Sequence, residues 1–303
     1  MACAVHRIAN EIMNDAILTT KPVRPASSNT PPQFRVPPLS CDAHFHVFEP
    51  GYPHVERPHY TFPDASLDQY LALCRFLGIE RMVLVQPSFY GTDNSLLIDV
   101  LTRLGDRARG VVMIEEDISD AQLDGFHALG VRAIRLDLFA RASWSRGDLQ
   151  AYISRMLERA TPRGWHLQFY TPGYVVRDLL PFLTTLEHDF VIDHMGYMRE
   201  QDGLTEKDFA RLLDVMKTGR AWLKLSGPYR IAKHQGYESV AHLAQQIVAT
   251  RPERVLWGSD WPHLPDGTRD TGELLNLLVS WAPSETTRRR ILVDNPQRLF
   301  GFD

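Results

Sequence analysis

The sequence predicts a (β/α)8 barrel preceded by a proline-rich N-terminal tail. Eight short β-rich runs recur along the chain, and the residues between them leave room for a loop and a helix each time. No run is followed by the glycine-rich phosphate loop of a doubly wound open sheet, so the barrel is favoured over that alternative. The predicted strands are Leu39–His44, Arg81–Gln86, Gly110–Glu115, Val131–Leu136, Trp165–Tyr170, Phe190–His194, Ala221–Ser226 and Arg254–Asp260.

The tail covers residues 1–38 and the barrel residues 39–303. Residues 19–38 contain six prolines, which fix φ and remove backbone donors, so this segment should run extended outside the barrel. The first helix is expected after Ser66, a plausible N-cap, and should end at Gly78. The same start and stop pattern recurs over residues 92–105, 119–130 and 205–219.

The composition of the chain argues against several classes of function. The chain has 303 residues, is 44% hydrophobic and carries a net charge of −4 without any lysine–arginine block, which argues against nucleic acid as a partner. No apolar run reaches the roughly 20 residues of a membrane span. The cysteines are odd in number and follow no spacing pattern, which favours a reducing compartment. The N-terminal residues lack the unbroken apolar core of an export signal, so we expect a cytoplasmic protein. The oligomeric state stays open. The cysteines are Cys3, Cys41 and Cys74.

Polar residues follow the ends of the predicted strands, where a barrel of this kind carries its chemistry. Two histidines end the first strand, a third ends the sixth, and an aspartate ends the eighth. Tyr170 ends the fifth strand. Asp42 and Asp193 precede histidines and are expected to orient them. The candidate catalytic residues are therefore Asp260, His44, His46, His194 and Tyr170.

Three segments carry a family resemblance: DAHFH on the first strand, IDHMG on the sixth and WGSDWPH on the eighth. Together with VQPSFYGTDN, GVRAIRLDLF and DNPQRLF, they make the chain similar to the amidohydrolase superfamily, in the branch of the 2-pyrone-4,6-dicarboxylate lactonases. The resemblance covers residues 39–303 and implies the same barrel fold.

The resemblance also bears on a metal. Zinc members use a strand-five histidine, which is replaced here by Tyr170, while His166 lies at the wrong end of that strand. The strand-four end also lacks a lysine for carboxylation. This departure resembles the pyrone lactonase, which works without a metal, and favours no cofactor. The alternative is one zinc ion held by His44, His46, His194 and Asp260, with Glu115 as an extra carboxylate.

Lactone opening needs a base for the attacking water and donors for the oxyanion. Asp260 is the expected base, and the three histidines are expected to polarise the carbonyl as N–H donors, with Tyr170 adding a further donor. Arginines suggest an acidic lactone as the small-molecule substrate. Of Arg132 and Arg135 only one can face inward, and Arg132 is preferred. The expected substrate-binding set is Arg132, Arg141, Arg230, Gln86, Asn94 and His263.

Three functions remain open. The first is a metal-independent hydrolase that opens a carboxylate-bearing lactone such as 2-pyrone-4,6-dicarboxylate. The second is a zinc-dependent sugar-acid lactonase or decarboxylase. The third is an inactive barrel that serves in binding or assembly, although such a protein should have lost catalytic positions that are all present here.

Overall fold

The computed structural model describes residues 22–55, 64–199, 202–232, 235–264 and 267–303. Its centre is a sheet of eight strands, each paired in parallel with the next along the chain. The last strand returns to the first, which closes the barrel and confirms the predicted fold. The strands are β1 (Cys41–Phe45), β2 (Arg81–Val85), β3 (Ala108–Val112), β4 (Val131–Asp137), β5 (His166–Tyr170), β6 (Phe190–Ile192), β7 (Ala221–Leu225) and β8 (Val255–Trp257).

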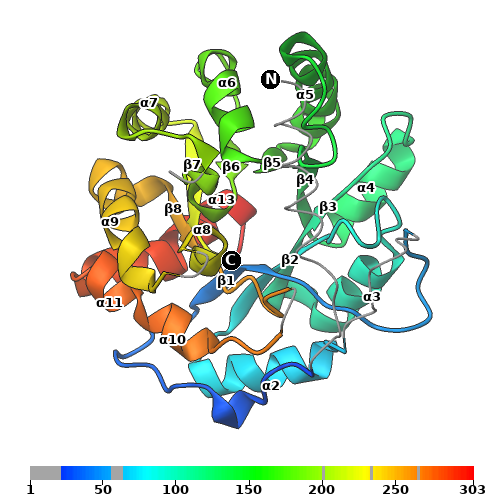
Figure 1. Ribbon diagram of the computed structural model, residues 1–303. Coiled ribbons are helices and arrows are strands. Elements are labelled where there is room, and N and C mark those ends of the chain that lie inside the picture. Colours follow the sequence, from blue (N-terminus) through cyan, green and yellow to red (C-terminus); the bar gives the residue numbers. More distant parts are fainter. Residues whose placement is uncertain (1–21, 56–63, 200–201, 233–234, 265–266) are drawn as a thin grey trace.

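Helices surround the strands on the outside of the barrel (Figure 1). The helices are α2 (Leu67–Leu77), α3 (Ser95–Leu104), α4 (Asp120–Ala128), α5 (Arg146–Ala160), α6 (Gly173–Leu183), α7 (Glu206–Lys217), α8 (Pro228–Ala232), α9 (Ala241–Thr250), α10 (Thr271–Asn276), α11 (Leu278–Trp281), α12 (Glu285–Arg289) and α13 (Asn295–Phe300). Within the ranges that the structure describes, no helix has the length and apolarity needed to cross a bilayer.

The helix signals in the sequence have the expected geometry. The side chain of Ser66 accepts from the backbone of Gln69, and the Gln69 side chain accepts from Ser66 in return, so α2 begins with a capping box. It ends at Gly78, whose φ of 76° is left-handed and suits glycine. Ser119 and Thr205 cap α4 and α7 in the same way as Ser66. Local sequence therefore sets where these helices start.

The described part of the tail lies outside the barrel, as expected. A short 3-10 helix, Ala26–Ser28, lies beside α2, and Thr30 donates from its backbone N–H to the Asp270 carboxylate at 2.9 Å. Asp270 is also the N-cap of α10. The tail thus fastens the loop between β8 and α10. The prediction for residues 1–21 lies outside the described residues.

The barrel interior changes character along its axis. At the starts of the strands it is mostly apolar, and Phe300 and Phe302 from the C-terminal segment pack there against buried strand residues. The guanidinium of Arg109 covers the Phe302 ring, 4.6 Å from its centroid. At the other end, buried histidines, carboxylates and a lysine replace the apolar side chains. The polar end is therefore the place to look for chemistry.

Candidate active site

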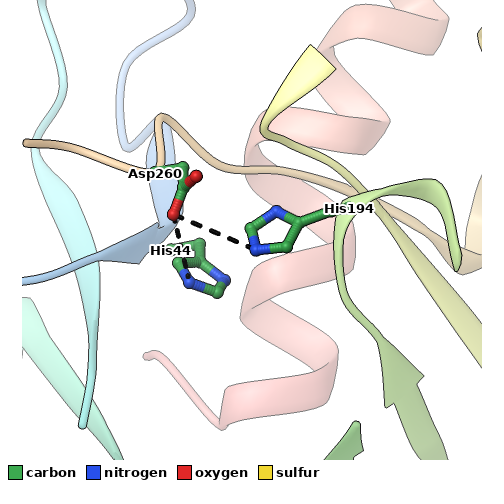
Figure 2. A group of neighbouring side chains, drawn as sticks. All are labelled: His44, His194 and Asp260. Atoms are coloured by element: carbon green, nitrogen blue, oxygen red, sulfur yellow. Dashed lines mark ion pairs between the residues drawn. The ribbon is translucent and has the colours of Figure 1, made fainter. Parts of the chain in front are cut away.

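Three histidines and one aspartate converge at the polar end. His44 is in β1, His46 follows it, and His194 and Asp260 lie just after β6 and β8. The Asp260 Oδ1 atom lies 3.7 Å from His44 Nε2, 3.7 Å from His46 Nε2 and 4.0 Å from His194 Nε2. Figure 2 shows His44, His194 and Asp260 turned toward one another. His194 and Asp260 both have left-handed φ angles, of 50° and 60°, a costly conformation that often occurs at functional sites.

The two carboxylate oxygens of Asp260 have different surroundings. Oδ2 accepts hydrogen bonds from the Tyr229 hydroxyl and, at 2.6 Å, from Arg230 Nε. Oδ1 is buried and accepts no hydrogen bond from the described residues. Burial alone would raise the pKa of Asp260, but the Arg230 guanidinium holds that pKa well below its usual range. Asp260 is therefore an ionised carboxylate with one oxygen directed at the histidines.

The histidines are neutral in this environment. Burial, as the largest effect, lowers the pKa of His44 and of His46, and it lowers that of His194 to about 4. His46 Nδ1 lies 2.7 Å from the Val85 carbonyl oxygen, which can only accept, so the proton is assigned to Nδ1. His46 Nε2 is then an acceptor, and the expectation that it polarises a carbonyl as an N–H donor is wrong.

A polar network lies behind His44. Lys224 Nζ, from β7, donates to Gln168 Oε1 at 2.7 Å, and Gln168 Nε2 donates to Asp193 Oδ2 at 3.1 Å. Burial would raise the pKa of Asp193, but the Lys224 ammonium holds that pKa well below the ordinary value. Burial lowers the pKa of Lys224 to about 8. Asp193 thus lies against His44 within a network that also includes a buried ammonium.

Tyr170 and Arg135 form one wall beside the histidines. The Arg135 guanidinium lies over the Tyr170 ring, 4.3 Å from its centroid, and donates from Nη1 to the Gln86 carbonyl oxygen. The Tyr170 ring meets the His194 ring edge-on, with centroids 6.1 Å apart. Phe139 also packs against Tyr170, with ring centroids 4.5 Å apart. This wall places a cation and a phenol next to the histidine cluster.

Comparison with known proteins identifies the family. A family model described as Amidohydrolase matches residues 41–302. The chain belongs to the amidohydrolase family. It is 36% identical to the 4-sulfomuconolactone hydrolase of Hydrogenophaga intermedia over 94% of this chain and 96% of that one. It is 35% identical to the 2-pyrone-4,6-dicarboxylate hydrolase of Comamonas testosteroni over 89% of this chain and 92% of that one.

A solved structure agrees with these relatives. The crystal structure from Acinetobacter baumannii, described as a probable 2-pyrone-4,6-dicarboxylic acid hydrolase with citric acid bound, has a TM-score of 0.76 and 26% sequence identity to this amidohydrolase. The match covers 87% of this chain and 100% of that one. The resemblance found in the sequence motifs is therefore confirmed.

The structure does not bring all of the expected substrate-binding residues of this amidohydrolase to the site. Arg132 is the second residue of β4, and its Nη1 donates to the carbonyls of His127 and Val131, at the end of the barrel opposite the histidines. The choice of Arg132 over Arg135 is thus wrong, because the strand alternation turns Arg135 toward the cluster. Arg230 reaches the site, but its Nε is bound to Asp260.

The remaining expected residues brace loops around the site. Gln86 Nε2 donates to the carbonyls of Gly91 and Asp93, and Asn94 Nδ2 donates to Thr92 and Met113, so both amides hold the loop between β2 and α3. His263 Nε2 lies 2.9 Å from Thr271 Oγ1, behind Tyr229. These contacts favour a structural role for all three side chains.

Three further expectations concern charged side chains. Arg141 donates to the Asp137 carbonyl and lies over Tyr152 in the loop after β4. Glu115 is exposed and accepts from the Thr92 hydroxyl, so it does not extend the histidine cluster. Asp42 accepts from the backbone N–H groups of His44 and Ser259, and it therefore holds the backbone at the β1–β8 junction instead of orienting an imidazole.

Four ligand atoms of the amidohydrolase could surround a divalent cation. His44, His194 and Asp260 each offer one ligand atom within 4.8 Å of the others. The Nε2 atoms of His44 and His46 are 3.3 Å apart, a separation that two ligands with bonds of about 2.0–2.2 Å to one ion can have. Oδ1 of Asp260, which accepts no hydrogen bond from the described residues, supplies the carboxylate. The residues present therefore fit a metal ion.

Proposed function

We propose that this amidohydrolase hydrolyses the ring ester of a carboxylate-bearing lactone such as 2-pyrone-4,6-dicarboxylate. The observation that carries the proposal is Asp260, which is ionised, fixed through Oδ2 and directed through Oδ1 at the histidines. A carboxylate held in this way can take a proton from water. The relatives named as lactone hydrolases support the reaction class.

The steps follow from the positions of the side chains. A water molecule gives one proton to Asp260 Oδ1 while its oxygen attacks the lactone carbonyl. The resulting oxyanion then collapses and the ring C–O bond breaks. The leaving oxygen takes the proton that Asp260 accepted, which returns the carboxylate and yields a ring-opened acid. N–H groups near the carbonyl stabilise the oxyanion, with His44, His194 and Arg135 as the nearest candidates.

The substrate acid groups are proposed to bind Arg135, Arg230 and Tyr170. The Arg135 guanidinium is stacked on Tyr170 beside the histidines. Arg230 is bound to Asp260 by Nε, yet 22% of its side chain is exposed, which leaves surface for a carboxylate. Arg141, in the loop after β4, donates to the Asp137 carbonyl and stays a candidate for a second acid group. The citric acid in the Acinetobacter structure is consistent with an acidic ligand.

We favour hydrolysis without a resident metal. The two buried carboxylates that lie against the imidazole rings already have a cation each, because Lys224 lies 3.4 Å from Asp193 and Arg230 lies 2.6 Å from Asp260. A divalent ion would add two positive charges beside Arg135, and burying unbalanced charge is unfavourable. The alternative is an ion held by His44, His46, His194 and Asp260. Such an ion would polarise the carbonyl and acidify water.

Assays of purified protein test both proposals. A panel of lactones with and without acid groups, including sugar-acid lactones, should show ring opening of the acidic lactones only. Treatment with a strong chelator, followed by metal analysis of the protein, should leave that activity unchanged. Activity that disappears with the metal and returns with added zinc would favour the zinc-dependent alternative. The absence of any lactone opening, with the protein folded, would favour a binding role.

We also propose a reducing, cytoplasmic location. Cys41 and Cys74 are both buried free thiols in the structure. A disulfide framework would be expected to use such residues in an oxidising compartment. Fractionation of cells that express the protein would test this directly.

A further inference from the structure

Lys224 is a buried ammonium that the proposed reaction does not use. Its side chain is 0% exposed, and it lies behind His44 as seen from Asp260. Burying an ammonium is costly unless it is paired, and apolar replacements of buried ion pairs are often at least as stable. A strand position between Leu223 and Leu225 could hold an apolar side chain instead. The lysine is therefore better explained by what its N–H groups do than by stability.

The hydrogen bonds around Lys224 form a chain with a fixed direction. Lys224 Nζ lies 3.3 Å from His44 Nδ1, and His44 Nε2 lies 3.3 Å from His46 Nε2. His46 Nδ1 lies 2.7 Å from the Val85 carbonyl oxygen. An ammonium can only donate and a carbonyl can only accept, so both ends of the chain are fixed. His44 Nδ1 must then accept from Lys224, and its proton must be on Nε2.

A competing partner exists for the same nitrogen. Asp193 Oδ1 is 3.3 Å from His44 Nδ1 and could accept a proton from it. However, Asp193 Oδ1 also lies 3.4 Å from Lys224 Nζ, an ammonium that can serve the carboxylate in place of the imidazole, and the contacts that end at the Val85 carbonyl require the His44 proton on Nε2. We infer that Lys224 is a positioning residue that holds His44 in the tautomer with its proton on Nε2.

The inference extends the proposed function, and the catalytic role that it gives to His44 rests on that function. With its proton on Nε2, His44 can donate to the lactone carbonyl. Once the His44 N–H turns from His46 to the lactone carbonyl, the Nε2 lone pair of His46 is free and can accept the second O–H of the water whose first proton goes to Asp260 Oδ1, 3.7 Å away. The two histidines of one motif thus have opposite roles. The same tautomer also opposes a metal, because a metal needs the Nε2 lone pair of His44.

The decisive measurement does not require substrate. Multiple-bond proton–nitrogen correlation spectra of the protein labelled with ¹⁵N-histidine distinguish a ring nitrogen that carries hydrogen from one that does not. We expect His44 to carry hydrogen on Nε2 and His46 on Nδ1 in the unmodified protein, with the signals assigned by His44→Gln and His46→Gln. A proton on His44 Nδ1 would overturn the inference, whether or not the protein opens lactones.

The substitution Lys224→Met tests whether Lys224 sets the tautomer of His44. In Lys224→Met, Asp193 becomes the nearest described polar partner for His44 Nδ1, so the proton should move to Nδ1 and free Nε2 for a cation. Zinc affinity, measured by chelator competition, should then rise by about tenfold or more, the usual range for changes behind a ligand. Lys217→Met, at an exposed lysine in α7, is the matched control and should change neither measurement.

Each outcome bears on the inference. An unchanged tautomer and unchanged zinc affinity in a folded Lys224→Met would show that Lys224 does not set the tautomer. Should Lys224→Met fail to fold, the spectrum of the unmodified protein still decides the matter. If the tautomers are as expected but no lactone is opened, the proposed function fails and the inference about Lys224 stands.

Discussion

Arg230 holds Asp260 through a single carboxylate oxygen, with 2.6 Å between Arg230 Nε and Asp260 Oδ2. The other oxygen faces the histidines and accepts no hydrogen bond from the part of the chain that the structure describes. An ion pair of this form keeps the carboxylate ionised and oriented, yet it leaves one oxygen able to accept a proton. Anchoring and reactivity are thus divided between the two oxygens of one side chain.

Replacing Asp260 by asparagine should remove the base while keeping the shape of the side chain. The amide oxygen of the new side chain could still accept from Arg230, so we expect Asp260→Asn to fold. The kcat for an acidic lactone should fall by at least about 100-fold, the usual range for loss of a general base. Steady-state kinetics and circular dichroism measure the two properties. A kcat within a few-fold of the unmodified enzyme would mean that another group takes the proton.

Arg230→Met should lower both kcat and stability, because it leaves the buried Asp260 carboxylate without its cation. Removing one partner of a buried pair costs about 3–5 kcal/mol, and the value here should lie lower because 22% of the Arg230 side chain is exposed. Thermal unfolding and the separate values of kcat and KM provide the test. Arg141→Met, which removes a guanidinium bound to the Asp137 carbonyl, is the comparison and should leave kcat nearly unchanged. Equal effects of the two substitutions would contradict the special role of Arg230.

Arg135 should matter for acidic lactones and Arg132 should not. A partly buried charge-assisted hydrogen bond is worth roughly 1.5–3 kcal/mol, so Arg135→Met should raise KM for an acidic lactone by about 10-fold or more. Because the acid group does not react, kcat should change less. Arg132→Met, at the opposite end of β4, should leave KM unchanged. A similar KM increase for a neutral lactone would point to a structural role for Arg135 instead.

Acid should destabilise the protein through buried His166. Burial lowers its pKa from 6.5 to about 3, and its Nε2 has no hydrogen-bond partner among the described residues. Between these two values the unfolded chain binds a proton that the folded protein does not, so stability falls as pH drops below about 6.5, by up to about 1.4 kcal/mol per pH unit.

The test compares urea unfolding at pH 7 and pH 5. His166→Leu should lose less stability across this interval than the unmodified protein, because it removes one group that is protonated only on unfolding. His242→Leu, at an exposed position in α9, is the control and should follow the unmodified protein. The same pH dependence in all three proteins would exclude His166 as a contributor.

The alternation of strands and helices was enough to predict the barrel. Capping residues and apolar periodicity act locally, so they can be recognised in the sequence without knowledge of the fold. The proximity of His44, His46, His194 and Asp260 was also predictable, because the carboxyl ends of parallel strands lie at the same end of the barrel. Side chains alternate along β4, so only one of Arg132 and Arg135 can face inward. The sequence does not say which one, because pairing with β3 and β5 decides which face of β4 turns into the barrel. On β1 the register is irregular between Asp42 and Phe45, so simple alternation does not predict which side chains face inward there.

Lys224 and Tyr229 show a second limit. A lysine in a strand usually has its charge in solvent, and nothing near Lys224 in the sequence signals its partners, because Gln168 and His44 come from other strands. Tyr229 directly precedes Arg230 in the sequence, and its hydroxyl donates to the Asp260 carboxylate, which lies after another strand. Such contacts depend on how distant segments meet and cannot be inferred from local pattern.

The closure of the barrel depends on the same residues as the proposed chemistry. The backbone N–H of Asp260 donates to the His44 carbonyl, and that of His46 donates to the Trp261 carbonyl, both at 2.8 Å. Local opening between the first and last strands would therefore separate the base from the histidines in the same event. We therefore expect mild denaturing stress that opens this junction to abolish the proposed activity before the fold as a whole is lost.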